Sequence, residues 1–66
     1  MTLTITKTIR GYDWDFRCEP IPGLEKFWRC EVYDNTGRNV TFFDGTTPTE
    51  ALDRAILYAT QTVEKK

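Results

Sequence analysis

Two aspartates, Asp13 and Asp15, stand two positions apart near the N-terminus. In an extended strand such residues share a face at a spacing of about 6.5–7 Å. Carboxylates at this spacing can perform acid–base chemistry or hold a divalent cation. No third acidic residue follows at a ligand spacing. The plainer interpretation is therefore a pair of solvated charges that lie opposite threonines on a neighbouring strand.

The two cysteines, Cys18 and Cys30, are the other candidates for chemistry. The sequence has no histidine, which removes the commonest general base and the commonest metal ligand. Two cysteines alone are too few for a zinc site. Both are expected on the core face, where a free cysteine is usually inert, although a disulfide can form if neighbouring strands bring the two residues close together. We predict no catalytic residue, no metal and no cofactor.

The composition indicates one small globular domain of 66 residues, with 39% hydrophobic and 29% charged residues. Nine basic and ten acidic residues give a net charge of −1, so no general positive field attracts nucleic acid. The N-terminus lacks a signal-peptide pattern, and no apolar run approaches the length of a membrane span. We expect a cytoplasmic protein with reduced thiols and no membrane partner.

Two segments with alternating apolar residues, 3–9 and 12–19, are predicted to be the first two strands. Their alternation has opposite phases. A two-residue turn at Arg10-Gly11 explains the change, because Gly11 can adopt the positive φ of a primed hairpin turn. This hairpin places the apolar residues of both strands on one face. A single long strand with a bulge at Gly11 is the alternative.

Residues 27–33 and 39–43 are predicted to form a second hairpin. The run Pro20-Ile21-Pro22-Gly23 is expected to end the second strand before it, since proline cannot donate to a ladder of backbone hydrogen bonds.

A three-residue loop over 35–37, with Gly37 left-handed, is predicted to join these two strands. It pairs Cys30 with Phe42. Phe42 is then expected in the core and Phe43 on the outer face of the sheet.

The run Thr47-Pro48-Thr49-Glu50 predicts the start of a helix over about residues 48–64. Thr47 caps the first amides, Pro48 takes the first helical position, and Glu50 reaches back to complete a capping box. An apolar stripe follows at helical spacing, formed by Ala51, Leu52, Ala55, Ile56, Ala59 and Val63. We therefore predict a single α+β domain over residues 1–66, a four-stranded antiparallel β-meander with one C-terminal α-helix packed on one face.

The outer face of this predicted sheet combines aromatic residues with arginine. Such a surface suits a protein interface, although it can also stack the bases of single-stranded nucleic acid, and ordinary cross-strand pairing explains it most plainly. Acidic residues on the same face would repel phosphates, which disfavours nucleic acid. Leu57 faces away from the helix stripe and is a second candidate contact. The candidate partner-binding residues are Phe27, Arg29, Tyr33, Phe43, Arg17 and Leu57.

Residues 9–12, Trp28, Gly37 and residues 47–56 together resemble small uncharacterised strand-rich domains that end in one helix. Residues 47–56 are also similar to the end of HicB-type antitoxin domains, where a threonine-capped Glu-Ala-Leu helix follows the sheet. HicB-type proteins usually add a DNA-binding segment, for which 66 residues have no room. The resemblance implies a non-catalytic partner-binding domain.

These observations predict a regulatory or inhibitory protein-binding domain of phage or mobile-element type, not an enzyme, that acts through its open sheet face. A homodimer through a sheet edge is a further expectation. Single-stranded nucleic-acid binding by the outer aromatic residues is the alternative function.

Overall fold

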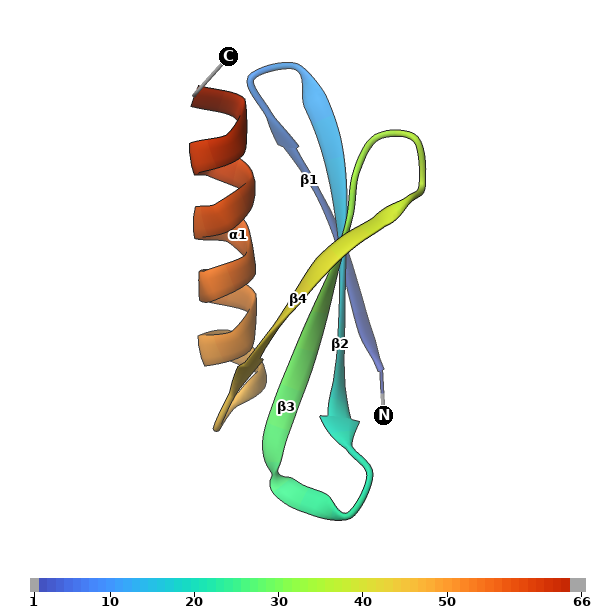
Figure 1. Cartoon of the computed structure of the whole chain (residues 1–66), viewed down its shortest axis with the longest axis vertical. Helices are drawn as coiled ribbons and strands as arrows, with labels where there is room; N and C mark the ends of the chain where they lie inside the picture. Colours follow the sequence, from blue (N-terminus) through green and yellow to red (C-terminus); the bar gives the residue numbers. More distant parts are fainter. Residues whose placement is uncertain (1, 65–66) are drawn as a thin grey trace.

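A computed structural model describes residues 2–64 of the chain, apart from the side chain of Glu25. Its elements are β1 (Leu3–Ile9), β2 (Tyr12–Ile21), β3 (Leu24–Tyr33), β4 (Asn39–Gly45) and α1 (Pro48–Glu64). The strands form one antiparallel sheet in the order β1-β2-β3-β4. Helix α1 lies on one side of this strongly twisted sheet (Figure 1). The predicted ββββα fold is confirmed.

The first hairpin has the predicted two-residue turn. Arg10 and Gly11 both have positive φ, 51° and 84°, as a primed turn requires. Ile9 lies opposite Tyr12, and the regular pairing continues to the N-terminal end of β1. The two segments are therefore separate strands, and the alternative of one long bulged strand is wrong.

The run Pro20-Ile21-Pro22-Gly23 ends the second strand as predicted, but the strand extends two residues past the predicted bound of about 19. β2 continues to Ile21, which pairs with Leu24 across a tight turn, and the pairing is irregular between Pro20 and Ile21. β1 ends its pairing opposite Cys18, so Pro20 lies where β2 has a neighbour on one side only. Proline is tolerated there because one side of the strand needs no hydrogen-bond donor.

The loop between β3 and β4 is closed as predicted. Gly37 has a φ of 82°, and the backbone N–H of Asp34 donates to the carbonyl of Arg38 at 3.0 Å. Asp34 Oδ1 also accepts from Thr36 N, Thr36 Oγ1 and Arg38 N at 2.9, 2.6 and 3.1 Å. The bond from the Thr36 hydroxyl, followed by the two backbone bonds, lowers the pKa of the Asp34 carboxyl.

An extra residue in β4 changes the register beyond this loop. The pairing shifts by one position next to Tyr33, so Cys30 lies opposite Phe43 and not Phe42. The predicted positions of both phenylalanines are therefore wrong: Phe43 faces the core and Phe42 faces out. Alternation could not reveal the bulge, because Val40, Phe42 and Phe43 supply apolar side chains in both phases.

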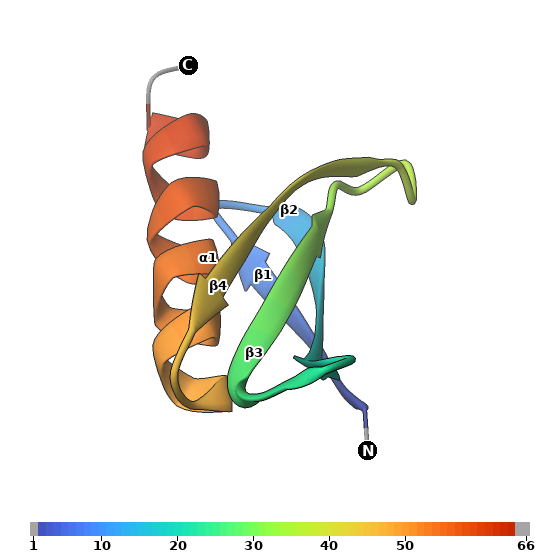
Figure 2. The same ribbon diagram turned by 60° about the horizontal axis from the view of Figure 1, so that its bottom comes forward.

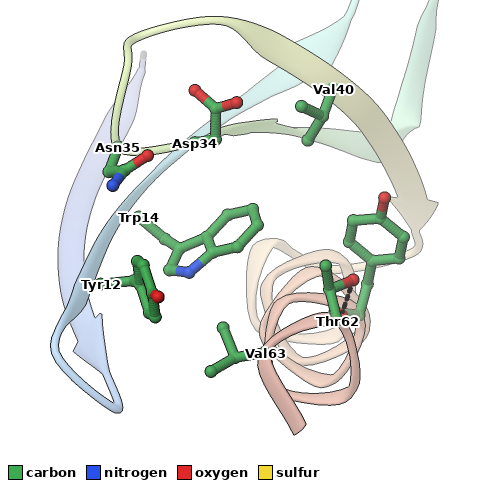
Figure 3. A pocket seen from close by; sticks show the side chains of 8 residues that line it. Tyr12, Trp14, Asp34, Asn35, Val40, Thr62 and Val63 are labelled. Carbon is green, nitrogen blue, oxygen red and sulfur yellow. Dashed lines mark hydrogen bonds between the residues drawn. The ribbon is translucent and has the colours of Figure 1, made fainter. Parts of the chain in front are cut away.

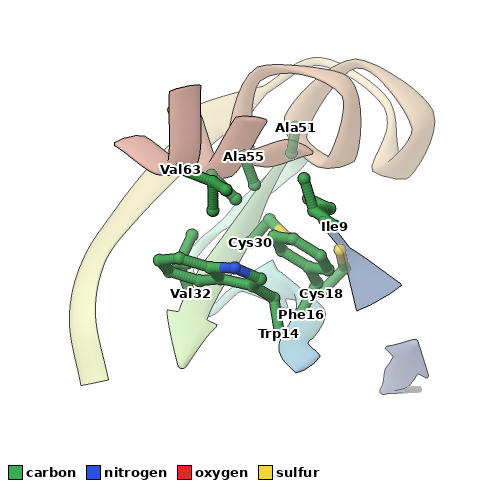
Figure 4. Close-up of a cluster of buried hydrophobic side chains, with 10 residues drawn as sticks. Ile9, Trp14, Phe16, Cys18, Cys30, Val32, Ala51, Ala55 and Val63 are labelled. Atoms are coloured by element: carbon green, nitrogen blue, oxygen red, sulfur yellow. The ribbon is translucent and has the colours of Figure 1, made fainter. Parts of the chain in front are cut away.

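The core lies between α1 and one face of the sheet (Figure 4). Phe16 and Val32 have no exposed surface, and α1 meets the sheet with alanines that are equally buried, namely Ala51, Ala55 and Ala59. Small side chains at these positions let the helix approach the strands closely. Phe43 packs against this core and meets the ring of Tyr58 at a centroid distance of 5.6 Å.

The helix begins at Pro48, as predicted. Thr47 Oγ1 accepts from the N–H of Glu50 at 3.1 Å, which confirms the cap. In a capping box the carboxylate of Glu50 would accept from the backbone N–H of Thr47. Here it accepts instead from the preceding residue, from Thr46 N at 3.4 Å and Thr46 Oγ1 at 3.1 Å. Helix α1 is neither long enough nor apolar enough to cross a membrane, and it is the only helix in residues 2–64.

Candidate partner-binding surface

The outer face is the side of the sheet that points away from α1, and no element of residues 2–64 covers it (Figure 2). The register assigns its side chains strand by strand. They are Thr4, Thr6 and Thr8 on β1, Asp13, Asp15, Arg17 and Glu19 on β2, Arg29, Glu31 and Tyr33 on β3, and Phe42 and Asp44 on β4.

An arginine held over an exposed phenylalanine is the most ordered feature of the outer face. The guanidinium carbon of Arg29 lies 4.2 Å from the centroid of the Phe42 ring, within the range of a cation–π contact. Arg29 Nε donates to Asp44 Oδ1 at 2.9 Å, and Asp44 lies directly opposite on β4. This bond raises the pKa of the guanidinium. Phe42 remains 50% exposed.

The prediction of Phe43 as an outer contact is wrong, because the bulge in β4 turns its ring toward α1. Phe42 is the residue that the sequence interpretation missed. A different signal could have found it: the bulged register places Arg29 opposite Asp44, an opposite-charge pair that stabilises neighbouring strands. In the predicted register, without the bulge, Arg29 and Asp44 would not lie opposite each other.

The remaining candidates do not form one patch. Tyr33 and Arg17 lie on the outer face, where Tyr33 donates to Glu31 at 3.4 Å. Phe27 is 42% exposed beside the β2–β3 turn, two positions before Arg29. Leu57 is 57% exposed on α1, the layer on the opposite side of the sheet, and is therefore separate from the others.

The outer face carries more acidic than basic residues, since five carboxylates accompany only Arg17 and Arg29. Two of these carboxylates accept hydrogen bonds from threonine hydroxyls of β1, Thr6 to Asp15 at 2.7 Å and Thr8 to Asp13 at 2.6 Å. The predicted placement of both aspartates opposite threonines of β1 is confirmed. Among the described side chains, no group of three histidine, cysteine or acidic residues could hold a metal ion.

The two cysteines lie directly opposite each other on β2 and β3, and both are buried and free. Burial, followed by a hydrogen bond to Cys18, raises the pKa of the Cys30 thiol far above its ordinary value. A protonated thiol is a poor nucleophile. Cys30 is therefore a core residue and not a reactive one at neutral pH.

Comparison with models of protein families, with curated proteins and with solved structures finds no match for this chain. The resemblance to HicB-type antitoxin domains stays a prediction. A functional proposal rests on the geometry of the surface.

Proposed function

We propose that the protein is a small non-catalytic binding domain that regulates or inhibits a protein partner through its outer face. The observation that supports this best is the guanidinium of Arg29, held between Asp44 and the half-exposed ring of Phe42. Arginine and aromatic side chains are the usual anchors of protein interfaces. An anchor that is already ordered loses little conformational freedom when a partner binds.

The charge of the surface supports a partner of a particular kind. The outer face that carries the Arg29–Phe42 pair holds five carboxylates and two arginines. A complementary surface would offer basic residues around an apolar centre. The same carboxylates disfavour single-stranded nucleic acid, because they repel phosphates. In addition, the guanidinium occupies the face of Phe42 on which a base would stack.

Two finer expectations belong to this proposal. β1 is an edge strand, with β2 as its one neighbour in the sheet, which supports pairing with a second copy of the chain. The free thiols of Cys18 and Cys30 support a cytoplasmic location, where thiols are kept reduced. A phage or mobile-element role rests on the sequence resemblance alone.

Affinity capture from a lysate of the organism that encodes the protein tests the proposal, with Phe42→Ser and Arg29→Gln as variants. Leu57→Ser is the matched control, because it removes an equally exposed apolar side chain from the opposite layer. We expect a partner that the wild type and Leu57→Ser retain and that both outer-face variants lose. Retention of that partner by Phe42→Ser, with the fold intact by circular dichroism, would contradict the site.

The nucleic-acid alternative is tested with a fluorescent single-stranded oligonucleotide. We expect no binding at low salt. An affinity that is lost in Phe42→Ser and that falls steeply with added salt would replace the protein partner with nucleic acid.

A further inference from the structure

A hollow of about 200 Å³ lies between the sheet and the last turns of α1, and its lining includes neither Arg29 nor Phe42. The β1–β2 turn, the β3–β4 loop and the C-terminal end of α1 come together at this end of the molecule (Figure 1). Three aromatic residues line the hollow, Tyr12, Trp14 and Tyr58, together with Val40 and Val63. It is therefore a mainly apolar site at the junction of three elements.

The aromatic walls of the hollow are well supported. The indole of Trp14 is 7% exposed and lies in the middle of the lining side chains (Figure 3). The ring of Tyr58 packs on Phe43, which belongs to the core. Tyr12 is 45% exposed and forms the side of the hollow nearest the first hairpin turn. Rings of this kind attract organic cations, and Trp and Tyr attract them most strongly.

The electrostatics of the hollow also favour a cation. Asp34 is the charged residue in its lining, and an aspartate carboxylate is ionised at neutral pH, although its Oδ1 atom accepts the hydrogen bonds of the loop. The last turn of α1, which contributes Val63, has no basic residue and presents the partial negative charge of a helix C-terminus. No basic side chain of residues 2–64 lines the hollow.

A donor without an acceptor faces the same site. The Nε1 atom of Trp14 is buried and has no hydrogen-bond partner among the described residues. Its N–H edge points toward the space between Tyr12 and Val63 (Figure 3). Buried donors are almost always paired in native proteins, by protein groups or by ordered water. This N–H is therefore available to an oxygen acceptor on a molecule that enters the hollow.

We propose that the hollow binds a small organic ammonium ion that carries an oxygen acceptor, with its cationic group against the aromatic rings and its oxygen on Trp14 Nε1. The site is separate from the outer face and does not depend on the function proposed for that face. The ligand is either a free amino alcohol or the same cationic group presented on a peptide.

A titration followed by the indole N–H resonances in a ¹⁵N–¹H correlation spectrum tests this site. Choline is the first probe, and 3,3-dimethyl-1-butanol is its neutral counterpart of the same shape. We expect choline to move the Trp14 resonance and the neutral alcohol to bind at least about tenfold more weakly. Trp28, which lies opposite Pro20 and Gly45 and outside the lining, is the internal reference.

Tetramethylammonium separates the two parts of the proposal, because it has the charge without the oxygen. We expect it to bind more weakly than choline and to leave the Trp14 N–H unbonded. A peptide that contains trimethyllysine distinguishes the source: tighter binding than choline indicates a partner protein, and weaker binding indicates a free solute.

Tyr12→Leu keeps the apolar volume and removes one ring, so it should weaken choline binding by about tenfold. Asp34→Asn should weaken it less, because the carboxylate acts from the rim. Phe42→Leu, a change of an equally exposed ring on the outer face, should leave it unchanged. Lys65→Gln/Lys66→Gln removes the two ammonium groups that follow α1 in the sequence and should bind choline at least as tightly as the wild type.

Two results would overturn the proposal. One is an unchanged Trp14 resonance up to about 100 mM choline, a concentration at which even very weak binding is visible. The other is equal binding of choline and its neutral counterpart, which would show an apolar hollow without preference for charge. Binding of a partner at the outer face is unaffected by either result.

Discussion

The two faces of the sheet are built from the same four strands and hold the molecule in different ways. On the face under α1, Phe16, Cys30 and Val32 have no exposed surface. On the outer face the contacts are exposed hydrogen bonds and ion pairs, such as that of Arg29 with Asp44. Burial of apolar surface stabilises a fold far more than exposed ion pairs do. The fold therefore rests on one face, and the other is free to serve recognition.

The largest expected effect comes from comparing a phenylalanine of the covered face with one of the outer face. Phe16→Ala should lower the free energy of unfolding by about 3–5 kcal/mol, because it leaves a cavity in the core. Phe42→Ala should lower it by about 1 kcal/mol or less, since its ring is half-exposed and loses mainly a cation–π contact. Urea denaturation of both variants measures the two values. Similar losses would show that the outer face also holds the fold.

A second test adds one methyl group to the face of the sheet that α1 covers. Gly45 is buried in β4, and a Cβ atom there would lie 2.7 Å from the backbone nitrogen of Ala51. Gly45→Ala should therefore destabilise the protein by about 1–3 kcal/mol, because backbone must move to make room. Thermal unfolding followed by circular dichroism measures the effect. An unchanged midpoint would mean that α1 can shift on the sheet without cost.

The start of α1 gives a third and smaller effect. Thr47→Ala removes the acceptor for the N–H of Glu50 and should cost about 1 kcal/mol of stability. Thr49→Ala, an exposed position in the same helical turn, is the matched control and should change stability by less than about 0.5 kcal/mol. Equal effects in urea denaturation would show that helix propensity outweighs the cap.

Acidification gives the smallest expected effect, at Asp34 in the loop that joins β3 to β4. Because the folded state lowers the pKa of Asp34, its contribution is present above the unfolded value and is lost as the pH falls through the folded one. An NMR titration should place this pKa below about 3.9, the value of an unperturbed aspartate. Asp34→Asn should lose less stability than the wild type between neutral and acid pH, and an equal loss would contradict the assignment.

The two hairpins show how far the sequence leads. The first could be predicted to the residue, because apolar and polar side chains alternate, with Lys7 as the exception, and change phase at Gly11. The second was predicted correctly only at its loop. Past the loop, Val40, Phe42 and Phe43 satisfy either register, and the choice between them depends on contacts with other elements.

The candidate binding residues were likewise predicted correctly on β2 and β3 and wrongly on β4. Arg29, Tyr33 and Arg17 were placed on the outer face by the alternation of their strands, and that placement is confirmed. Phe42 was missed and Phe43 was wrongly included, because one bulged residue exchanges the faces of both. Leu57 was correctly placed on the exposed side of the helix, away from the core, and the structure shows it separate from the outer face.

The sequence by itself determined the order of the elements, the first turn and the helix cap, because these follow from interactions between near neighbours. The tertiary structure alone decided the bulge in β4, the pair of Arg29 with Phe42, and the aromatic hollow around Trp14. Each of these joins residues from different elements, and such contacts depend on how α1 packs against a twisted sheet. Local pattern carries no information about that packing.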